Sequence, residues 1–203
     1  IGESEQNRMV EKALIQGKDF ELSHPVIVND QTAHEPDIAV AADGTVWIVW
    51  SERRQTGDLI RLRSYHDGMA GAILDCSARQ GIEFQPAIAC VEDAVHLAWT
   101  AFRDGRWHLV TCTRRDDAFG DERIVISAPE GIFRPALLAA DNGDCWLICE
   151  VIEHRSPRLM ICRRHGDRWG DPAPLSGPTA PCYRPSLAQG PGHGIWASYD
   201  AYQ

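Results

Sequence analysis

The stretch that decides the fold is His34-Glu35-Pro36-Asp37-Ile38-Ala39-Val40, which runs on through Ala41-Ala42-Asp43-Gly44-Thr45 into Val46-Trp47-Ile48-Val49-Trp50. Two apolar runs on either side of an Asp-Gly turn predict a strand, a tight turn and a second strand. The pattern returns three more times, and its prolines follow one another at steps of 50, 49 and 50 residues: Pro36, Pro86, Pro135 and Pro185. The chain is therefore built from repeats.

The remainder of each repeat also has the pattern of strands. Short turns rich in Gly and Asp, which tolerate a positive φ, precede the same position of each unit: Phe20, Ala70, Phe119 and Trp169. Each unit thus holds four strands, which we call A to D from the proline onward. A period near 50 residues with strands in every unit is typical of a β-propeller, where each repeat forms one radial blade. We predict an all-β fold of four-stranded blades.

The two ends of the chain have complementary strand phases. Residues 8–28 carry strands C and D, and residues 177–203 carry strands A and B. Three full blades lie between them, at 29–77, 78–127 and 128–176. Joining the two ends would complete a closing blade and remove both exposed sheet edges. We expect a single domain over 1–203, with four blades closed in this way or as part of a larger propeller.

The composition limits the classes of partner. A formal net charge of −9 argues against nucleic acid or an anionic membrane surface as a partner. No apolar run approaches the length of a membrane span. The chain begins at Ile1, so a lost signal peptide stays open. Additional domains and a homo-oligomer also stay open.

Two residue types are expected in the core. The seven cysteines are an odd number without a disulfide pattern, and we interpret them as small buried hydrophobes. Unpaired cysteines weakly favour a reducing compartment, but the localisation stays unknown. Tryptophans recur at strand-B positions and are expected to pack between blades: Trp47, Trp50, Trp99, Trp146 and Trp196.

Three sequence features resemble the repeats of sialidase-like (BNR-type) β-propellers. They are the Arg-Pro or Glu-Pro before strand A, Asp43-Gly44-Thr45-Val46-Trp47 across the A–B turn, and residues 164–170 leading into strand D. The Asp box of that superfamily, Ser-x-Asp-x-Gly-x-Thr-Trp, is absent. Phe133-Arg134-Pro135 and Tyr183-Arg184-Pro185 are similar to a sialidase arginine element but lack the residue between Arg and Pro. The resemblance implies the fold and leaves the activity open.

The candidate binding site lies at the mouth of the central channel. There the D–A and B–C connections of a propeller share one face. The residues before the four prolines occupy one repeated position: Glu35, Gln85, Arg134 and Arg184. Further candidates are the aromatic neighbours and the B–C loops: Phe133, Tyr183, Arg53, Arg103, Glu153 and His154. Two arginines facing Glu35 beside aromatic rings suit a carboxylate-bearing or sugar ligand. The alternative is that these polar residues only pair with each other across a tight channel.

Three functions remain open from the sequence. Our leading hypothesis is a ligand-binding or scaffold module that recognises a glycan or another acidic ligand without catalysis. The alternatives are a sialidase-like glycoside hydrolase or polysaccharide lyase, and an architectural domain of a larger enzyme. A hydrolase needs a carboxylate pair, or a Tyr nucleophile backed by a carboxylate, and Glu35, Glu150, Glu153 and Tyr183 are available. No catalytic residue is assigned, no cofactor is expected, and no metal is expected because Glu150, Glu153 and His154 lack the helical spacing of metal motifs.

Overall fold

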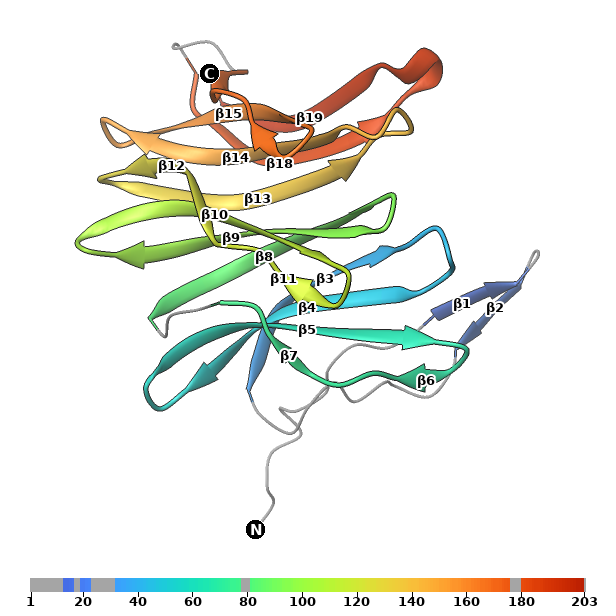
Figure 1. The fold of residues 1–203 in the computed structure, drawn as a ribbon. Helices are drawn as coiled ribbons and strands as arrows, with labels where there is room; N and C mark the ends of the chain where they lie inside the picture. The colour runs from blue at the N-terminus through green and yellow to red at the C-terminus, as the bar shows by residue number, and fades with distance from the viewer. Residues whose placement is uncertain (1–12, 17–18, 23–31, 78–80, 176–179, 203) are drawn as a thin grey trace.

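The computed structural model describes residues 13–16, 19–22, 32–77, 81–175 and 180–202. These residues are almost entirely β-structure, as the sequence predicts; within them the only helix is the short 3₁₀ segment η1 (Pro191–His193). No helix in the described part of the chain is long and apolar enough to cross a membrane. Figure 1 shows the strands arranged as successive antiparallel sheets, one per repeat.

Each full blade has three long strands and a short outer fourth strand that is interrupted. Blade 1 consists of β3 (Ala33–Val40), β4 (Val46–Arg54), β5 (Gly57–His66), β6 (Met69–Ala70) and β7 (Leu74–Asp75). Blade 2 consists of β8 (Ile82–Val91), β9 (Ala94–Arg103), β10 (Arg106–Arg115), β11 (Ala118–Phe119) and β12 (Arg123–Ala128). Blade 3 consists of β13 (Gly131–Ala139), β14 (Cys145–Glu153), β15 (Ser156–His165), β16 (Arg168–Trp169) and β17 (Ala173–Pro174).

Two hairpins stand outside the full blades. They are β1 (Ala13–Gln16) with β2 (Asp19–Leu22), and β18 (Cys182–Gln189) with β19 (Ile195–Ala201). Among the described residues β1 pairs only with β2, and β18 only with β19. The rest of 8–28 lies outside the described residues. The closing blade made from 8–28 and the C-terminal strands therefore stays a prediction.

Every strand A carries a β-bulge at its proline. Because proline has no N–H to donate, the ladder is interrupted there, and the register shifts between His34 and Asp37 and at the matching places of the other blades. The residue before each proline adopts a left-handed conformation, with φ of 52°, 52°, 48° and 51° in chain order: Glu35, Gln85, Arg134 and Arg184. Four non-glycine residues with the same uncommon φ mark one repeated structural position.

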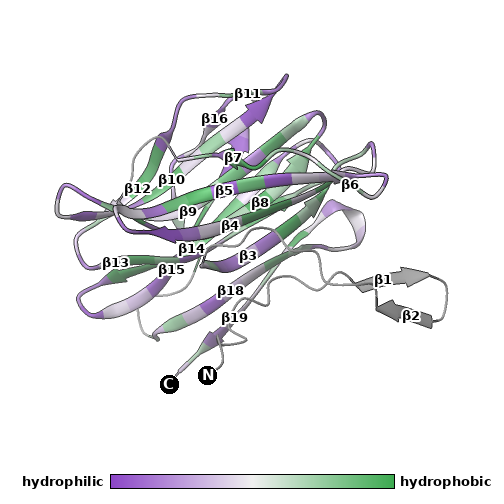
Figure 2. Cartoon of the chain, turned by 90° about the horizontal axis from the view of Figure 1, so that it is seen from below, coloured by the Kyte–Doolittle hydropathy of each residue, from purple (hydrophilic) through white to green (hydrophobic). Residues whose placement is uncertain are grey.

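The hydrophobic core lies between the sheets. Strands β3, β8, β13 and β18 are neighbours in turn along the inner side. Apolar residues of facing sheets pack between them, and Figure 2 shows these stretches in green. Six of the seven free cysteines are buried and Cys90 is half-buried, as expected of small core residues. The expectation for tryptophan is wrong at Trp196, which is 66% exposed because no further sheet covers that face in the described chain.

Candidate functional site

Three of the four residues before the prolines line one hollow. Glu35, Gln85 and Arg134 line it with their prolines, and Ser186 and Leu187 of β18 line its far side. Its volume is about 430 Å³. The structure thus places three of the four predicted channel residues around one space.

Successive blades are joined at this hollow by a relay of hydrogen bonds. The N–H of Gln85 donates to Glu35 Oε2 over 2.8 Å, and the N–H of Arg134 donates to Gln85 Oε1 over 2.7 Å. Each side chain therefore accepts the bulge N–H of the next blade. Glu and Gln can serve here because both present a carbonyl-type oxygen at the end of a chain of the same length.

The hydrogen bond between blades has a different acceptor where the bulge residue is arginine. Arg134 has no acceptor atom, and its Nη1 lies 3.1 Å from both carboxylate oxygens of the buried Glu150. Glu150 Oε1 then accepts the N–H of Arg184 over 2.5 Å. In the next unit Arg184 Nε lies 3.5 Å from Asp200 Oδ2. The structure pairs each arginine with the acid opposite it in its own blade, and not with Glu35.

The acids hold the same register position. Phe133 is opposite Glu150 and Tyr183 is opposite Asp200, whereas the two blades with Glu or Gln at the bulge have Ser51 and Thr100 at this place. An arginine at the bulge and an acid on strand B thus occur together. This co-occurrence within one chain was the signal that could have identified Glu150 and Asp200 as partners.

Asp37 adds a second link between blades 1 and 2. Its carboxylate accepts the N–H of Ile88 over 3.0 Å and that of Ile38 over 2.9 Å. Burial raises the pKa of Asp37 above its usual value, and the two N–H bonds oppose that rise.

Half-buried aromatic rings lie on the Arg134 side of the bulge positions, and they include Phe133, its neighbour in the chain. Trp107 contacts Phe102, Phe133 and Phe84, with ring centroids 4.9, 5.4 and 5.7 Å away. Phe84 and Phe133 directly precede the bulge residues Gln85 and Arg134. We call these four rings the aromatic cluster; sequence reasoning placed Phe102 in the B–C loop but missed Trp107, although it flanks the same turn.

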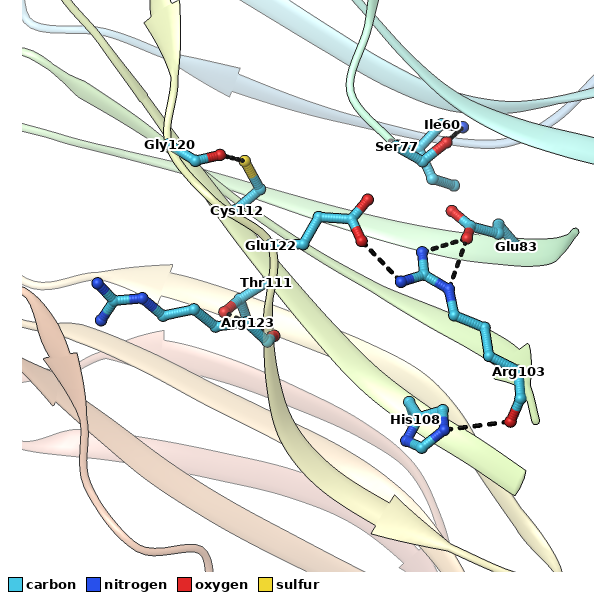
Figure 3. Close-up of polar contacts among 10 residues, drawn as sticks. All are labelled: Ile60, Ser77, Glu83, Arg103, His108, Thr111, Cys112, Gly120, Glu122 and Arg123. Atoms are coloured by element: carbon cyan, nitrogen blue, oxygen red, sulfur yellow. Dashed lines mark hydrogen bonds and ion pairs between the residues drawn. The ribbon is translucent and has the colours of Figure 1, made fainter. Parts of the chain in front are cut away.

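Arg103, predicted at the channel mouth, belongs to a separate cluster between blades 1 and 2. Figure 3 shows its guanidinium between the carboxylates of Glu83 and Glu122. Burial raises the pKa of the fully buried Glu83, and the ion pair with Arg103 opposes that rise. Arg103 and Glu122 line another hollow of about 620 Å³ together with His108. This cluster was not foreseen as a unit, because Glu83 stands on strand A and Glu122 just before the outer strand.

The other predicted site residues have local roles. Arg53 binds Asp58 over 3.0 Å, and Glu153 lies 3.5 Å from Arg158. His154 is an exposed turn residue with φ of 51°. Tyr183 contacts Tyr202 edge-on at 5.5 Å. In the described part of the chain no group of three potential metal-ligating side chains occurs.

Similar solved structures come from glycan-acting enzymes. They include the α-L-arabinanase of Penicillium chrysogenum with arabinobiose (TM-score 0.61, 13% identity, 85% of this chain and 59% of that chain). They also include the sialidase of Trypanosoma rangeli with the inhibitor DANA (TM-score 0.61, 12% identity, covering 93% of this chain and 37% of that chain). A third is the GH93 α-L-arabinofuranosidase of Fusarium graminearum with arabinobiose (TM-score 0.59, 12% identity, covering 83% of this chain and 56% of that chain). The fold is that of the sialidase-like β-propellers.

At these identities the likeness shows the fold alone. The chain spans between about a third and three fifths of the length of these three structures. No protein-family model matches the sequence, and no curated protein sequence matches it.

Proposed function

We propose that this chain recognises a glycan or another acidic ligand at the channel mouth. The observation that carries the proposal is that the accessible Arg134 lines the hollow and follows Phe133 of the aromatic cluster in the chain, while the accessible Arg184 holds the matching position in the next unit. The side chains of Arg134 and Arg184 are 49% and 68% exposed. A guanidinium binds a carboxylate through two parallel N–H bonds, and half-buried rings cover the apolar face of a sugar.

The glycan-acting neighbours support this ligand class without assigning an activity. An arabinanase, an arabinofuranosidase and a sialidase share the fold, but one fold carries many functions. Each acid considered for a hydrolase already has a partner: Glu150 is buried against Arg134, Glu35 accepts the N–H of Gln85, and Glu153 lies 3.5 Å from Arg158. We therefore place binding ahead of hydrolysis and test both together.

The test is a calorimetric titration with N-acetylneuraminic acid and glucuronic acid, with galactose as the neutral comparison. We expect the acidic sugars to bind and Arg184→Ala to weaken binding by about tenfold or more, the usual value of a charge-assisted bond. Arg184 suits the test because both members of its ion pair are about half exposed or more, so its loss has little effect on stability.

Arg115→Ala is the matched control. Its side chain is 43% exposed and pairs with Asp93 at the other end of the blade. Binding of neither acidic sugar, or equal weakening by Arg115→Ala and Arg184→Ala, would remove the proposed site. Release of sugar from sialylated or uronic-acid oligosaccharides during the titration would favour the hydrolase instead.

A further inference from the structure

A hollow of about 350 Å³ lies between blades 2 and 3, and it shares no lining residue with the channel mouth. Its lining includes three arginines that come from three different strands: Arg115 at the end of β10, Arg123 at the start of β12 and Arg164 on β15. Two carboxylates, Asp121 and Asp167, also belong to the lining. Both blades are full blades, so the hollow does not depend on the ends of the chain.

The three arginines converge on the hollow. Asp167 accepts hydrogen bonds from two of them: Arg164 Nη2 lies 3.1 Å from its carboxylate, and Arg123 Nη1 lies 2.7 Å from its carbonyl oxygen. Arg164 Nη1 approaches His96 Nε2 at 3.5 Å. After burial, the positive charges of Arg164 and Arg115 lower the pKa of this histidine, so both guanidinium groups lie near it.

Most N–H groups of these guanidinium groups have no partner among the described residues. Arg123 makes one hydrogen bond there, to Asp167, and Figure 3 shows its side chain extended away from the Arg103 cluster. The described contact of Arg115 is an ion pair with Asp93 at 3.4 Å. A guanidinium carries five N–H donors and no acceptor. The hollow therefore holds more donors than its own residues accept.

The interface between blades 1 and 2 shows which part of this arrangement belongs to the repeat. There Arg114 holds the place of Arg164, and each of the two pairs with the aspartate three residues further on. Arg114 lies 4.9 Å over the Trp47 ring, whereas blade 2 has His96 at that register position. The buried arginine is thus a repeated structural element, and beside Arg164 an imidazole fills less space than an indole.

The other two arginines are particular to blade 2. At the register positions of Arg115 and Arg123, blade 1 has His66 and Leu74. Leu74 packs against the core between blades 1 and 2, so an apolar side chain is sufficient to hold two blades together at this place. Packing of the blades therefore does not account for an arginine at position 123.

We propose that this hollow binds a phosphate or sulfate group, either as the free ion or as the ester of a small molecule. Guanidinium groups from three strands can donate to different oxygens of a tetrahedral anion, whereas a carboxylate offers two oxygens in one plane. The rings of Phe119 and Trp169 also line the hollow and can cover the apolar part of an ester. Its volume is within the usual range of small-molecule sites, about 300–1,000 Å³.

Calorimetric titration at constant ionic strength tests the proposal with inorganic phosphate, inorganic sulfate and glucose 6-phosphate, and acetate is the comparison. We expect phosphate and sulfate to bind with a dissociation constant below about 1 mM, and acetate to bind at least about tenfold more weakly. Tighter binding of glucose 6-phosphate than of phosphate would assign the site to an ester, and equal binding would assign it to the free ion.

Arg123→Ala is the variant that tests the site, because its exposed side chain contributes little to the fold. We expect an unchanged melting temperature and binding of phosphate weakened by about tenfold or more. Arg123→Lys should recover part of the binding, since lysine keeps the charge without the fork of donors. Arg168→Ala is the matched control: this exposed arginine on β16 precedes Trp169 and does not line the hollow. It should bind phosphate like the wild type.

Absence of binding of both phosphate and sulfate at about 10 mM overturns the proposal. Equal weakening by Arg123→Ala and Arg168→Ala overturns it as well, because the anion would then respond to net charge alone. The test is separate from that of the channel mouth. An acidic sugar held in this hollow would lose affinity in Arg123→Ala and not in Arg184→Ala, whereas one held at the channel mouth would show the reverse.

Discussion

At the scale of single residues, the contacts between successive blades depend on the four bulge positions. A left-handed backbone before proline is costly for a non-glycine residue, and each blade offsets that cost with an inter-blade hydrogen bond. Glu35 and Gln85 provide the acceptor directly, whereas Arg134 works through Glu150. The polar residues therefore connect the blades to one another, and the side chains of the two arginines stay 49% and 68% exposed.

The Arg134–Glu150 pair gives a prediction about stability. Glu150 is 2% exposed, so Arg134→Ala leaves a buried carboxylate with fewer partners. We expect a loss of about 2–3 kcal/mol of unfolding free energy, at the lower side of the range for buried pairs because Arg134 is half exposed. Urea unfolding measures it. A second substitution, Glu150→Gln, should recover part of the loss, because the amide oxygen still accepts the N–H of Arg184.

Equal unfolding free energies of the wild type and Arg134→Ala would contradict this prediction, because they would show that the buried Glu150 carboxylate does not need the arginine as a partner. Arg184→Ala is the comparison, since Asp200 is 48% exposed and the expected loss is below about 1 kcal/mol.

At the scale of elements, the interface between blades 2 and 3 contains a buried histidine. His96 lies on β9, and its Nδ1 is 3.0 Å from the Thr113 hydroxyl, while Arg164 Nη1 approaches Nε2. Nε2 therefore accepts and Nδ1 donates, which is the neutral form. Burial first, then the positive charges of Arg164 and Arg115, lower the pKa of His96 to about 4, and Asp167 opposes this only partly.

This lowered pKa predicts a loss of stability in acid. Between about pH 6.5 and pH 4 the unfolded chain binds a proton at this histidine and the folded chain does not. Unfolding free energy should therefore fall as the pH falls through this window, by about 3 kcal/mol in total. The full contribution is present above pH 6.5.

A comparison with His96→Gln isolates this effect from the carboxylates that titrate in the same range. Urea unfolding at pH 7 and pH 4.5 should show a smaller loss in the variant than in the wild type. The raised pKa values of Asp37 and Glu83 act in the opposite direction, because their protonated forms suit the buried sites. Parallel pH profiles for the two proteins would contradict a buried neutral histidine.

At the scale of the whole molecule, each sheet depends on its neighbours for burial of its faces. The core clusters lie between successive blades and contain residues from both. Such an array is stable in its interior and exposed at its ends. Ile38 and Val40 at one end and Trp196 at the other are the visible result.

The ends of the chain give a prediction at this scale. If residues 8–28 complete the blade begun by the C-terminal strands, deletion of residues 1–28 exposes an apolar edge. We then expect aggregation or loss of cooperative unfolding, measured by calorimetry together with the mass in solution. A deleted chain that stays soluble with an unchanged melting temperature would show that these strands are not needed for the fold.

Local patterns in the sequence were sufficient for the architecture. Strand alternation, Gly/Asp turns and the spacing of Pro36, Pro86, Pro135 and Pro185 are set by neighbouring residues, and they predicted the strands of each blade and the repeated position before each proline. The burial of the cysteines followed from the same alternation. The β-bulges were not predicted, although each proline marks one, because a bulge depends on the strand opposite.

Only the tertiary structure decided which charges meet. Glu150 lies 16 residues from Arg134 and 34 from Arg184, and the strand register together with the packing of the next blade brings all three together. Arg103 likewise pairs with Glu83 on the neighbouring strand of its hairpin, so it belongs to a cluster other than the one that the sequence predicted. Sequence spacing cannot specify such pairs, because a pairing partner is chosen by register and by the neighbouring sheet, and both arise only when the blades pack.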